Sequence, residues 1–407
     1  MRKTRVLVVD DSPFIRNAIT ESLSSDPEIE VVGTAANGRI ALMRFRELAP
    51  DLVTLDVDMP VMDGLATLRE LRRMAPSLPV VMCSALTERG ASATLDALAM
   101  GATCYITKPT KTSSMEESMS RLRDELLPKI RALGPGSTPA ERRMLTKSAR
   151  VQQSPPLDLL EQSTKPSPVP DSQTGAQREK EAAREKPVTS PAAPPPSTAP
   201  FPFPRPSGRI EIVVIGVSTG GPNALAELIP QLPADFPVPV AVVQHMPALF
   251  TKLVAERLNC QSALSVKEAK EGDFLLPGGA WIAPGDYHMT IQPASRHYRV
   301  ALNQDSPDNF CRPSVNVLFR SATQAFGGNV LGVILTGMGS DGTEGCRMIR
   351  AAGGQVLAQD ADSSVVWGMP GSVVEQRLAD AVLPISKIAQ NIIQRVSASR
   401  SLNPSPR

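Results

Sequence analysis

A long segment rich in proline and serine, residues 127–207, interrupts this chain of 407 residues and limits how it can fold. The segment ends in AAPPPSTAPFPFPRP and lacks the regularly spaced apolar residues that would offset the entropy lost on ordering. We therefore expect a disordered linker here, flanked by two domains with separate cores, residues 1–126 and 208–400.

Both flanking regions alternate short apolar runs with helical patterns. The first has five predicted strands, VLVVD, EVVGTA, LVTLD, VVMCSA and CYITK. In the second, IEIVVIG, PVAVVQ and VLGVILT are almost continuously apolar, which is typical of parallel strands covered on both faces. The alternation predicts the α/β class, with two doubly wound parallel-sheet domains, a flavodoxin-like one followed by a Rossmann-like one.

Charge, cysteine content and hydropathy exclude several classes of protein. The formal net charge of +2 gives no reason to expect nucleic acid or an anionic membrane as a partner. Five cysteines, an odd number without CxxC spacing, argue against a disulfide framework or a zinc cage. The sequence shows no signal peptide and no apolar run near the ~20 residues of a membrane-spanning helix. We expect a cytoplasmic monomer without direct membrane insertion.

Polar side chains end four predicted strands of the first domain. Asp10 and Asp11 follow the first strand, Asp56 ends the third, and Ser84 and Lys108 follow the fourth and fifth. Such ends meet at one edge of a parallel sheet, where three carboxylates require a cation, and Mg²⁺ matches them best. A lone Asp after a strand is more often a turn or a helix cap. The complete set in this order predicts a site for Mg²⁺ and a phosphoryl group.

A glycine-rich turn opens the second domain. Gly216-Val217-Ser218-Thr219-Gly220 follows the run EIVVIG and precedes a helical pattern, so it matches the nucleophile elbow that exposes a serine hydroxyl. It matches a phosphate-binding loop about equally well. The motif alone leaves both interpretations open.

Two further residues favour the nucleophile. His245, one of three histidines, follows PVAVVQ, and Asp341 lies just beyond VLGVILT, so both belong to loops at strand ends. We expect Ser218 to attack a carbonyl, His245 to transfer the proton and Asp341 to orient the imidazole. We expect His288 and His297 at an edge or on the surface.

The motifs of the first domain resemble the receiver domain of two-component response regulators. They are VVDDS, TLDVDMPVMDG, VVMCSA and YITKP, and the resemblance covers residues 5–126. It implies a histidine kinase as phosphodonor, Mg²⁺ bound by three carboxylates, a phosphoacceptor, two phosphoryl-binding residues and a switching aromatic. The carboxylates that bind Mg²⁺ would be Asp10, Asp11 and Asp56, and Asp56 would also be the phosphoacceptor. Ser84 and Lys108 would bind the phosphoryl group, and Tyr105 would be the switching aromatic.

The motifs of the second domain resemble the CheB family of chemotaxis protein-glutamate methylesterases. IGVSTGGP, VQHMP, IAPGDYH, RPSVNVLF, LTGMGSDG and VVWGMPG carry the resemblance over residues 208–395. It implies demethylation of glutamate methyl esters and deamidation of glutamines on chemoreceptors, recruitment to receptor arrays, and a hydrolase without a cofactor. It also implies that Thr219 positions His245 and that the Met338 backbone contributes to an oxyanion site.

Three features depart from that family pattern. Asn316 stands where an Asp is usual, and Trp367 stands where a smaller aromatic is common; we expect both at the rim of the site. The linker is also unusually long. The alternatives are a catalytically idle adaptor, a regulator with DNA-binding output, which the charge disfavours, and a methylesterase of a non-flagellar chemosensory pathway.

Overall fold

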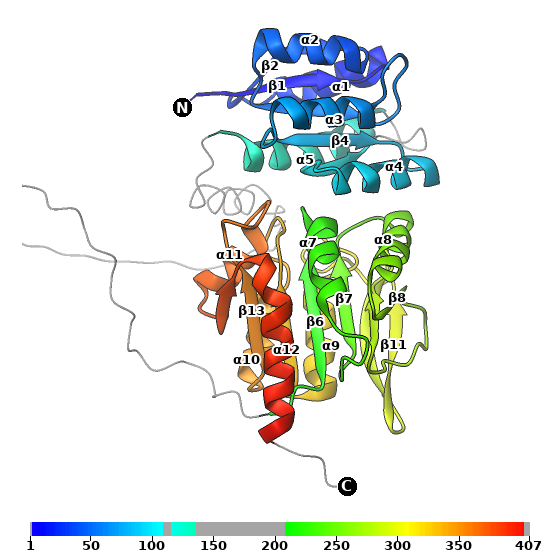
Figure 1. Ribbon diagram of the computed structural model, residues 1–407, viewed down its shortest axis with the longest axis vertical. Coiled ribbons are helices and arrows are strands. Elements are labelled where there is room, and N and C mark those ends of the chain that lie inside the picture. Colours follow the sequence, from blue (N-terminus) through cyan, green and yellow to red (C-terminus); the bar gives the residue numbers. More distant parts are fainter. Residues whose placement is uncertain (1, 109–114, 136–207, 403–407) are drawn as a thin grey trace, which may run out of the picture.

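The computed structural model describes residues 2–108, 115–135 and 208–402, and confirms two α/β domains, each built on a parallel sheet (Figure 1). Most of the predicted linker, residues 136–207, lies outside the described residues. Within them, no helix combines the length and the apolar character needed to span a membrane.

The first domain is a five-stranded parallel sheet in the order β2-β1-β3-β4-β5, with helices on both faces. This is the flavodoxin-like order, whose direction of winding reverses between β1 and β3. The strands are β1 (Thr4–Val9), β2 (Ile29–Ala35), β3 (Leu52–Asp56), β4 (Val80–Ser84) and β5 (Cys104–Thr107). The helices are α1 (Pro13–Ser24), α2 (Gly38–Leu48), α3 (Gly64–Met74), α4 (Glu88–Ala99) and α5 (Met115–Leu133).

Helix α5 continues beyond residue 126, where we expected the linker to begin. Leu122, Leu126 and Ile130, spaced four residues apart, are all buried against the first domain. This apolar stripe holds the last turns of the helix on the core, even though Pro128 lies inside them.

The second domain is a seven-stranded parallel sheet in the order β14-β13-β12-β6-β7-β9-β8. Its winding reverses between β6 and β12, as in a Rossmann-like fold. The strands are β6 (Ile212–Val217), β7 (Val240–Gln244), β8 (Ser265–Glu268), β9 (Gly279–Ile282), β12 (Val330–Ile334), β13 (Gln355–Gln359) and β14 (Ala381–Leu383). The helices are α7 (Gly221–Leu228), η1 (Ile229–Gln231), α8 (Ala248–Gln261), α9 (Val315–Phe326), α10 (Thr343–Ala351), α11 (Gly368–Glu375) and α12 (Ile385–Leu402).

An antiparallel hairpin, β10 (His288–Ala294) and β11 (His297–Asn303), forms a separate two-stranded sheet in the second domain. The sequence predicted these as strand-like runs but not as a pair. The segment that follows the hairpin leads back towards the start of α9, and it supplies part of the site described below.

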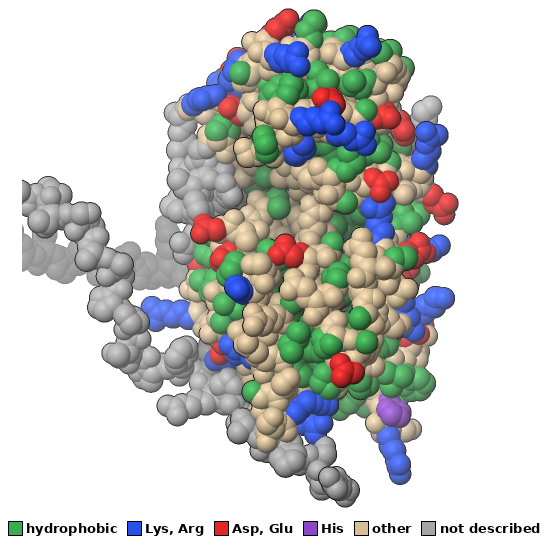
Figure 2. Space-filling model, viewed as in Figure 1, with side chains coloured by type: hydrophobic (Ala, Val, Ile, Leu, Met, Phe, Trp, Pro, Cys, Tyr) green, Lys and Arg blue, Asp and Glu red, His purple; other side chains and the backbone are tan. Residues whose placement is uncertain are grey.

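The first domain sits on the end of the second where α7 and α8 lie (Figure 1). The Tyr105 and Phe250 rings stack with centroids 4.8 Å apart. Asn223 Nδ2 donates to the Leu98 carbonyl at 3.0 Å, and Arg257 pairs with Asp96 at 2.5 Å. On the face in Figure 2, acidic and basic side chains are interspersed over both domains.

Candidate functional site

Ser218 lies directly after β6, at the point where the sheet winding reverses. Its backbone N–H donates to the Thr336 carbonyl at 3.0 Å, and Gly220, at φ +82°, turns the chain into α7. The loop after β12 approaches closely at Gly337, where an added Cβ would lie 2.8 Å from the Ser218 Cβ. Glycine therefore allows the two loops to meet at the serine.

Gln244, which the sequence analysis missed, ties the serine and histidine loops together. It is buried at the end of β7, and its Nε2 donates to the carbonyls of Ser218 at 3.0 Å and His245 at 3.3 Å. The His245 backbone N–H donates to the Val217 carbonyl at 3.1 Å. A polar residue inside an otherwise apolar buried strand was the available sign of this role.

Asp341 is buried and accepts five hydrogen bonds. Three come from the start of α9: Ser314 Oγ at 3.0 Å, and the amides of Val315 at 2.7 Å and Asn316 at 3.0 Å. The others come from the Gly342 amide and His245 Nε2, both at 2.8 Å. Burial alone would raise the pKa of Asp341, but the imidazole and these amides outweigh it and lower the pKa below its ordinary value.

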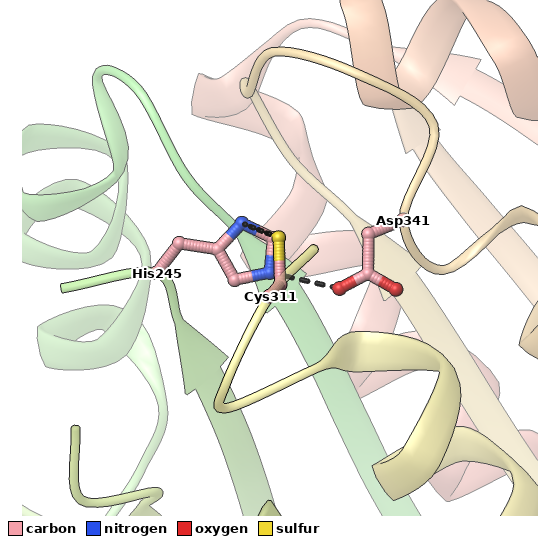
Figure 3. Close-up of side chains that lie close together, drawn as sticks. All are labelled: His245, Cys311 and Asp341. Atoms are coloured by element: carbon pink, nitrogen blue, oxygen red, sulfur yellow. Dashed lines mark hydrogen bonds and ion pairs between the residues drawn. The ribbon is translucent and has the colours of Figure 1, made fainter. Parts of the chain in front are cut away.

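Cys311 and Asp341 both lie against the His245 ring, and one N, S or O atom of each of the three residues lies within 4.8 Å of the others (Figure 3). Nε2 contacts Asp341 Oδ2, and Nδ1 lies 3.8 Å from Cys311 Sγ. Burial lowers the pKa of His245, but the hydrogen bonds to Asp341 and Cys311 outweigh it and raise the pKa to about 10. Because Nε2 contacts Asp341, Nδ1 is the ring nitrogen that the carboxylate does not engage.

The expectation that Asn316 lies at the rim was wrong. Asn316 is buried, and its Oδ1 accepts from the amides of Gly342 at 3.1 Å and Gly345 at 2.9 Å, at the start of α10. An amide oxygen can perform this capping without placing a second carboxylate beside Asp341. Trp367, at the start of α11, is half-buried and donates from Nε1 to the Gln359 carbonyl at 3.0 Å.

His288 does lie on an edge strand, since β10 and β11 form a sheet of two strands, but it is not on the surface. This histidine is buried, its Nδ1 accepts from the Ser314 amide at 3.2 Å, and its Nε2 lies 3.2 Å from the Ser306 carbonyl. It therefore holds the segment that leads into α9, whereas His297 is exposed as expected.

A cavity of about 950 Å³ contains the serine, the histidine and the aspartate. Thr219 and Met338 line it as well, and the Thr219 carbonyl accepts from Thr336 Oγ1 at 2.9 Å. The first domain lines the same cavity from α4, β5 and α5, with Leu98, Cys104, Tyr105, Thr107, Asp124, Glu125 and Lys129. The predicted hydrolytic residues therefore face the first domain across one cavity.

The structure also brings the predicted carboxylates of the first domain together. Asp10 and Asp56 are buried, Asp11 is exposed, and one oxygen of each lies within 4.8 Å of the others. Lys108 Nζ pairs with Asp10 at 2.8 Å and with Asp56 at 2.7 Å. Burial raises the pKa of Asp10, and it raises that of Asp56 to about 6 despite the Lys108 charge. Three hard oxygen donors with one compensating cation fit a Mg²⁺ ion.

The remaining predicted residues of this site lie beside it. Ser84 is fully buried at the end of β4, next to Asp56 in the sheet order, and its carbonyl accepts from the Lys108 amide at 2.8 Å. Tyr105 lies on β5, facing the second domain through its stack on Phe250. Burial raises the pKa of Tyr105 well above its ordinary value.

Two family models match the chain. The one described as CheB methylesterase covers residues 213–392, and the one described as response regulator receiver domain covers residues 6–120.

Similar proteins cover nearly the whole chain. A protein-glutamate methylesterase/protein-glutamine glutaminase of Trichodesmium erythraeum (strain IMS101) is 44% identical over 397 residues, 97% of this chain and 100% of the relative. One of Nocardioides sp. (strain ATCC BAA-499 / JS614) is 45% identical over 398 residues, 97% of this chain and 96% of the relative. The CheB methylesterase catalytic domain of Thermotoga maritima is 45% identical, with a TM-score of 0.45, and covers 46% of this chain and 98% of that one.

Proposed function

We infer the chemistry of this chain from its family: it belongs to the CheB methylesterase family and carries a response regulator receiver domain before the catalytic domain. It is a protein-glutamate methylesterase and protein-glutamine glutaminase. Both reactions transfer the acyl group of a glutamyl side chain to water, with methanol or ammonia as the leaving group.

We assign the hydrolysis to Ser218, His245 and Asp341. The Ser218 hydroxyl attacks the side-chain carbonyl while His245 Nδ1 takes its proton, and the ring then protonates the leaving methanol or ammonia. Water attacks the acyl-enzyme by the same route. The observation that carries this assignment is the His245–Asp341 hydrogen bond of 2.8 Å, anchored by the amides at the start of α9. Asp341 stays ionised and stabilises the imidazolium that forms.

Thr219 and Met338 border the same cavity, which supports their roles in positioning His245 and in binding the oxyanion. For Nδ1 to reach Ser218, the contact with Cys311 must open, because the thiol lies against that nitrogen. Catalytic hydrogen bonds commonly form only when substrate is bound.

We propose that the unphosphorylated receiver covers the catalytic cavity and that phosphorylation moves it away. Asp10, Asp11 and Asp56 would hold Mg²⁺, Asp56 would accept a phosphoryl group from a histidine kinase, and Ser84 and Lys108 would bind its oxygens. Mg²⁺ would supply charge neutralisation at the acceptor carboxylate. The Tyr105–Phe250 stack and the Arg257–Asp96 pair hold the receiver over the cavity. Changes at β4 and β5 would reach the second domain through Tyr105.

The protein substrates would be chemoreceptors, reached from the aqueous side at receptor arrays, and the hydrolase would need no cofactor. The test is methanol release from methylated receptor by the full chain, with and without an acyl-phosphate donor and Mg²⁺. We expect the donor to raise the rate in the wild type but not in Asp56→Asn, and Ser218→Ala to remove turnover under both conditions. Equal rates with and without the donor would overturn the proposal that the receiver covers the cavity. Turnover by Ser218→Ala would overturn the assignment of Ser218 as the nucleophile.

A further inference from the structure

Phe310 exposes an aromatic side chain at the catalytic cavity, although the hydrolytic mechanism gives it no task. The residue is 91% exposed, more than any other large apolar residue that the structure describes. It borders the cavity that contains Ser218 and His245, and the Sγ atom of its neighbour Cys311 lies 3.8 Å from His245 Nδ1. A large apolar group is thus open to solvent beside the site of hydrolysis.

The backbone that carries Phe310 is strained. Asp308 and Cys311 exchange two backbone hydrogen bonds, at 3.2 and 3.0 Å, and enclose a turn of two residues, Asn309 and Phe310. Both turn residues have a positive φ, +52° and +63°, as in a type I′ turn. Asparagine suits the first of these positions and glycine the second, so phenylalanine at the second is unfavourable. Such strain persists where the surroundings enforce it, and it is common at ligand-binding sites.

Side chains on both sides of the turn hold it in place. Asp308 accepts from Arg320 Nη2 at 3.1 Å and from Asn316 Nδ2 at 3.3 Å, both on α9. Arg312 pairs with Asp286 at 2.7 Å and donates to two carbonyls of the preceding segment at 3.0 and 3.1 Å. The turn is therefore fixed at both ends, while the aromatic side chain that it presents stays exposed.

We propose that Phe310 is a substrate-binding residue, which packs against an apolar side chain beside the glutamyl ester on the receptor surface. This inference rests on the proposed function, in which the substrate is a side chain of a receptor protein. Such a substrate presents the residues around the ester to the enzyme as well, whereas the triad contacts only the acyl group. An aromatic side chain on a fixed turn buries a large apolar area on binding and loses little conformational entropy.

The surroundings of Phe310 favour an apolar partner. Met246 and Met338 of the second domain border the same cavity. Arg312, the basic residue nearest in the chain, is already paired with Asp286. Phe310 is exposed even though the receiver lines this cavity, so the receiver does not occupy its side chain. The side chain is therefore available to a substrate.

Methanol release from methylated receptor by the full chain, with acyl-phosphate donor and Mg²⁺, tests this role. We expect Phe310→Ala to raise KM and lower kcat/KM by about 10–100-fold, the effect of one phenylalanine no longer buried, with kcat at saturating receptor unchanged. Phe310→Leu keeps an apolar side chain and should stay within about threefold of the wild type. Phe274→Ala changes an exposed phenylalanine that does not line the cavity, and this matched control should keep the wild-type KM.

Two further measurements separate recognition from folding and from chemistry. Phe310→Gly relieves the positive-φ strain that alanine keeps, so we expect it to unfold at a higher denaturant concentration than Phe310→Ala, yet to lose as much kcat/KM. In the inactive Ser218→Ala chain, adding Phe310→Ala should weaken the binding of methylated receptor by the same factor.

A wild-type KM in Phe310→Ala and Phe310→Gly, or a loss confined to kcat, would overturn the proposal. If Ser218→Ala keeps its turnover, the proposed nucleophile is wrong, whereas the comparison of KM values at position 310 still decides the role of this side chain.

Discussion

Asp56 and Asp341 each lie where the strand order of a parallel sheet reverses, and each residue is 2% exposed, yet their pKa values move in opposite directions. Asp56 shares one lysine with a second buried carboxylate, Asp10. Asp341 faces four N–H or O–H donors besides the imidazole. Burial raises the pKa of both carboxyls, and the hydrogen-bond donors and the imidazole around Asp341 outweigh it there, whereas Lys108 does not outweigh it at Asp56.

The difference matches what each site is proposed to do. In the receiver, one lysine does not fully offset the negative charge of the buried carboxylates. A bound cation, or conversion of Asp56 to an acyl phosphate, would therefore stabilise them. The carboxylate of the hydrolase is fully compensated by its own domain, and it remains a fixed charge throughout turnover.

Removing the charge at position 341 should have the largest effect on activity. Asp341→Asn puts an amide where His245 needs an acceptor, so the wrong tautomer is favoured, and we expect turnover to fall by about 10⁴-fold. Methanol release from methylated receptor measures it, and Asp273→Asn, at a half-buried aspartate paired with Lys267, is the control. Retention of a tenth of the activity would contradict the proposed role.

The pH dependence should be steep. His245 accepts a proton from Ser218 only when the ring is neutral, and its raised pKa of about 10 keeps it protonated at lower pH. We therefore expect kcat/KM of the unphosphorylated chain to rise about tenfold per pH unit below that value. A plateau in kcat/KM reached near the ordinary histidine pKa would contradict this. In Cys311→Ser the plateau should begin at a lower pH than in the wild type, because the thiol contact helps to raise the pKa of His245.

The same substitution, aspartate to asparagine, should change stability in opposite directions in the two domains. Asp56→Asn removes a buried charge that burial disfavours, so we expect the receiver to gain about 1–2 kcal/mol at neutral pH. Asp341→Asn leaves donors at the start of α9 without their anion, so we expect the catalytic domain to lose about 1–3 kcal/mol.

Chemical unfolding without Mg²⁺ separates these effects. Both tryptophans, Trp281 and Trp367, belong to the second domain, so their fluorescence reports that domain, while circular dichroism reports both. If both variants changed the free energy of unfolding in the same direction, the proposed difference between Asp56 and Asp341 would be wrong.

The smallest effect should come from the contact between the domains. Arg257→Ala removes a pair with Asp96 that is partly exposed, and such pairs contribute about 0.2–1 kcal/mol. We expect the turnover of the unphosphorylated chain to rise by at most about fivefold, with less difference at high salt. Lys252→Ala, at an exposed cation on the same helix, should leave the rate unchanged.

Most of the site residues that could be predicted from the sequence lie at the ends of predicted strands. Asp10, Asp56, Ser218 and His245 follow short apolar runs, and the geometry of parallel sheets alone brings such positions together. The spacing of Leu122, Leu126 and Ile130 was also present in the sequence, and Ile130 lies beyond the boundary that we drew from composition.

The parts that were missed depend on the path of one segment. Cys311 and Asn316 reach the site because the chain between β11 and α9 folds back against the loop that holds Asp341. His288 is buried under the same segment. No periodicity encodes such a path, because it is set by hydrogen bonds between residues far apart in the chain.

The donors around Asp341 all belong to the catalytic domain, and this has a consequence for how a signal is read out. The receiver, as proposed, contributes a wall of the cavity and none of these hydrogen bonds. Each uncovered molecule would then work at full strength, and phosphorylation would alter how many molecules are open. The stimulus would then change the number of active enzyme molecules, so that the apparent maximum rate varies while KM stays constant.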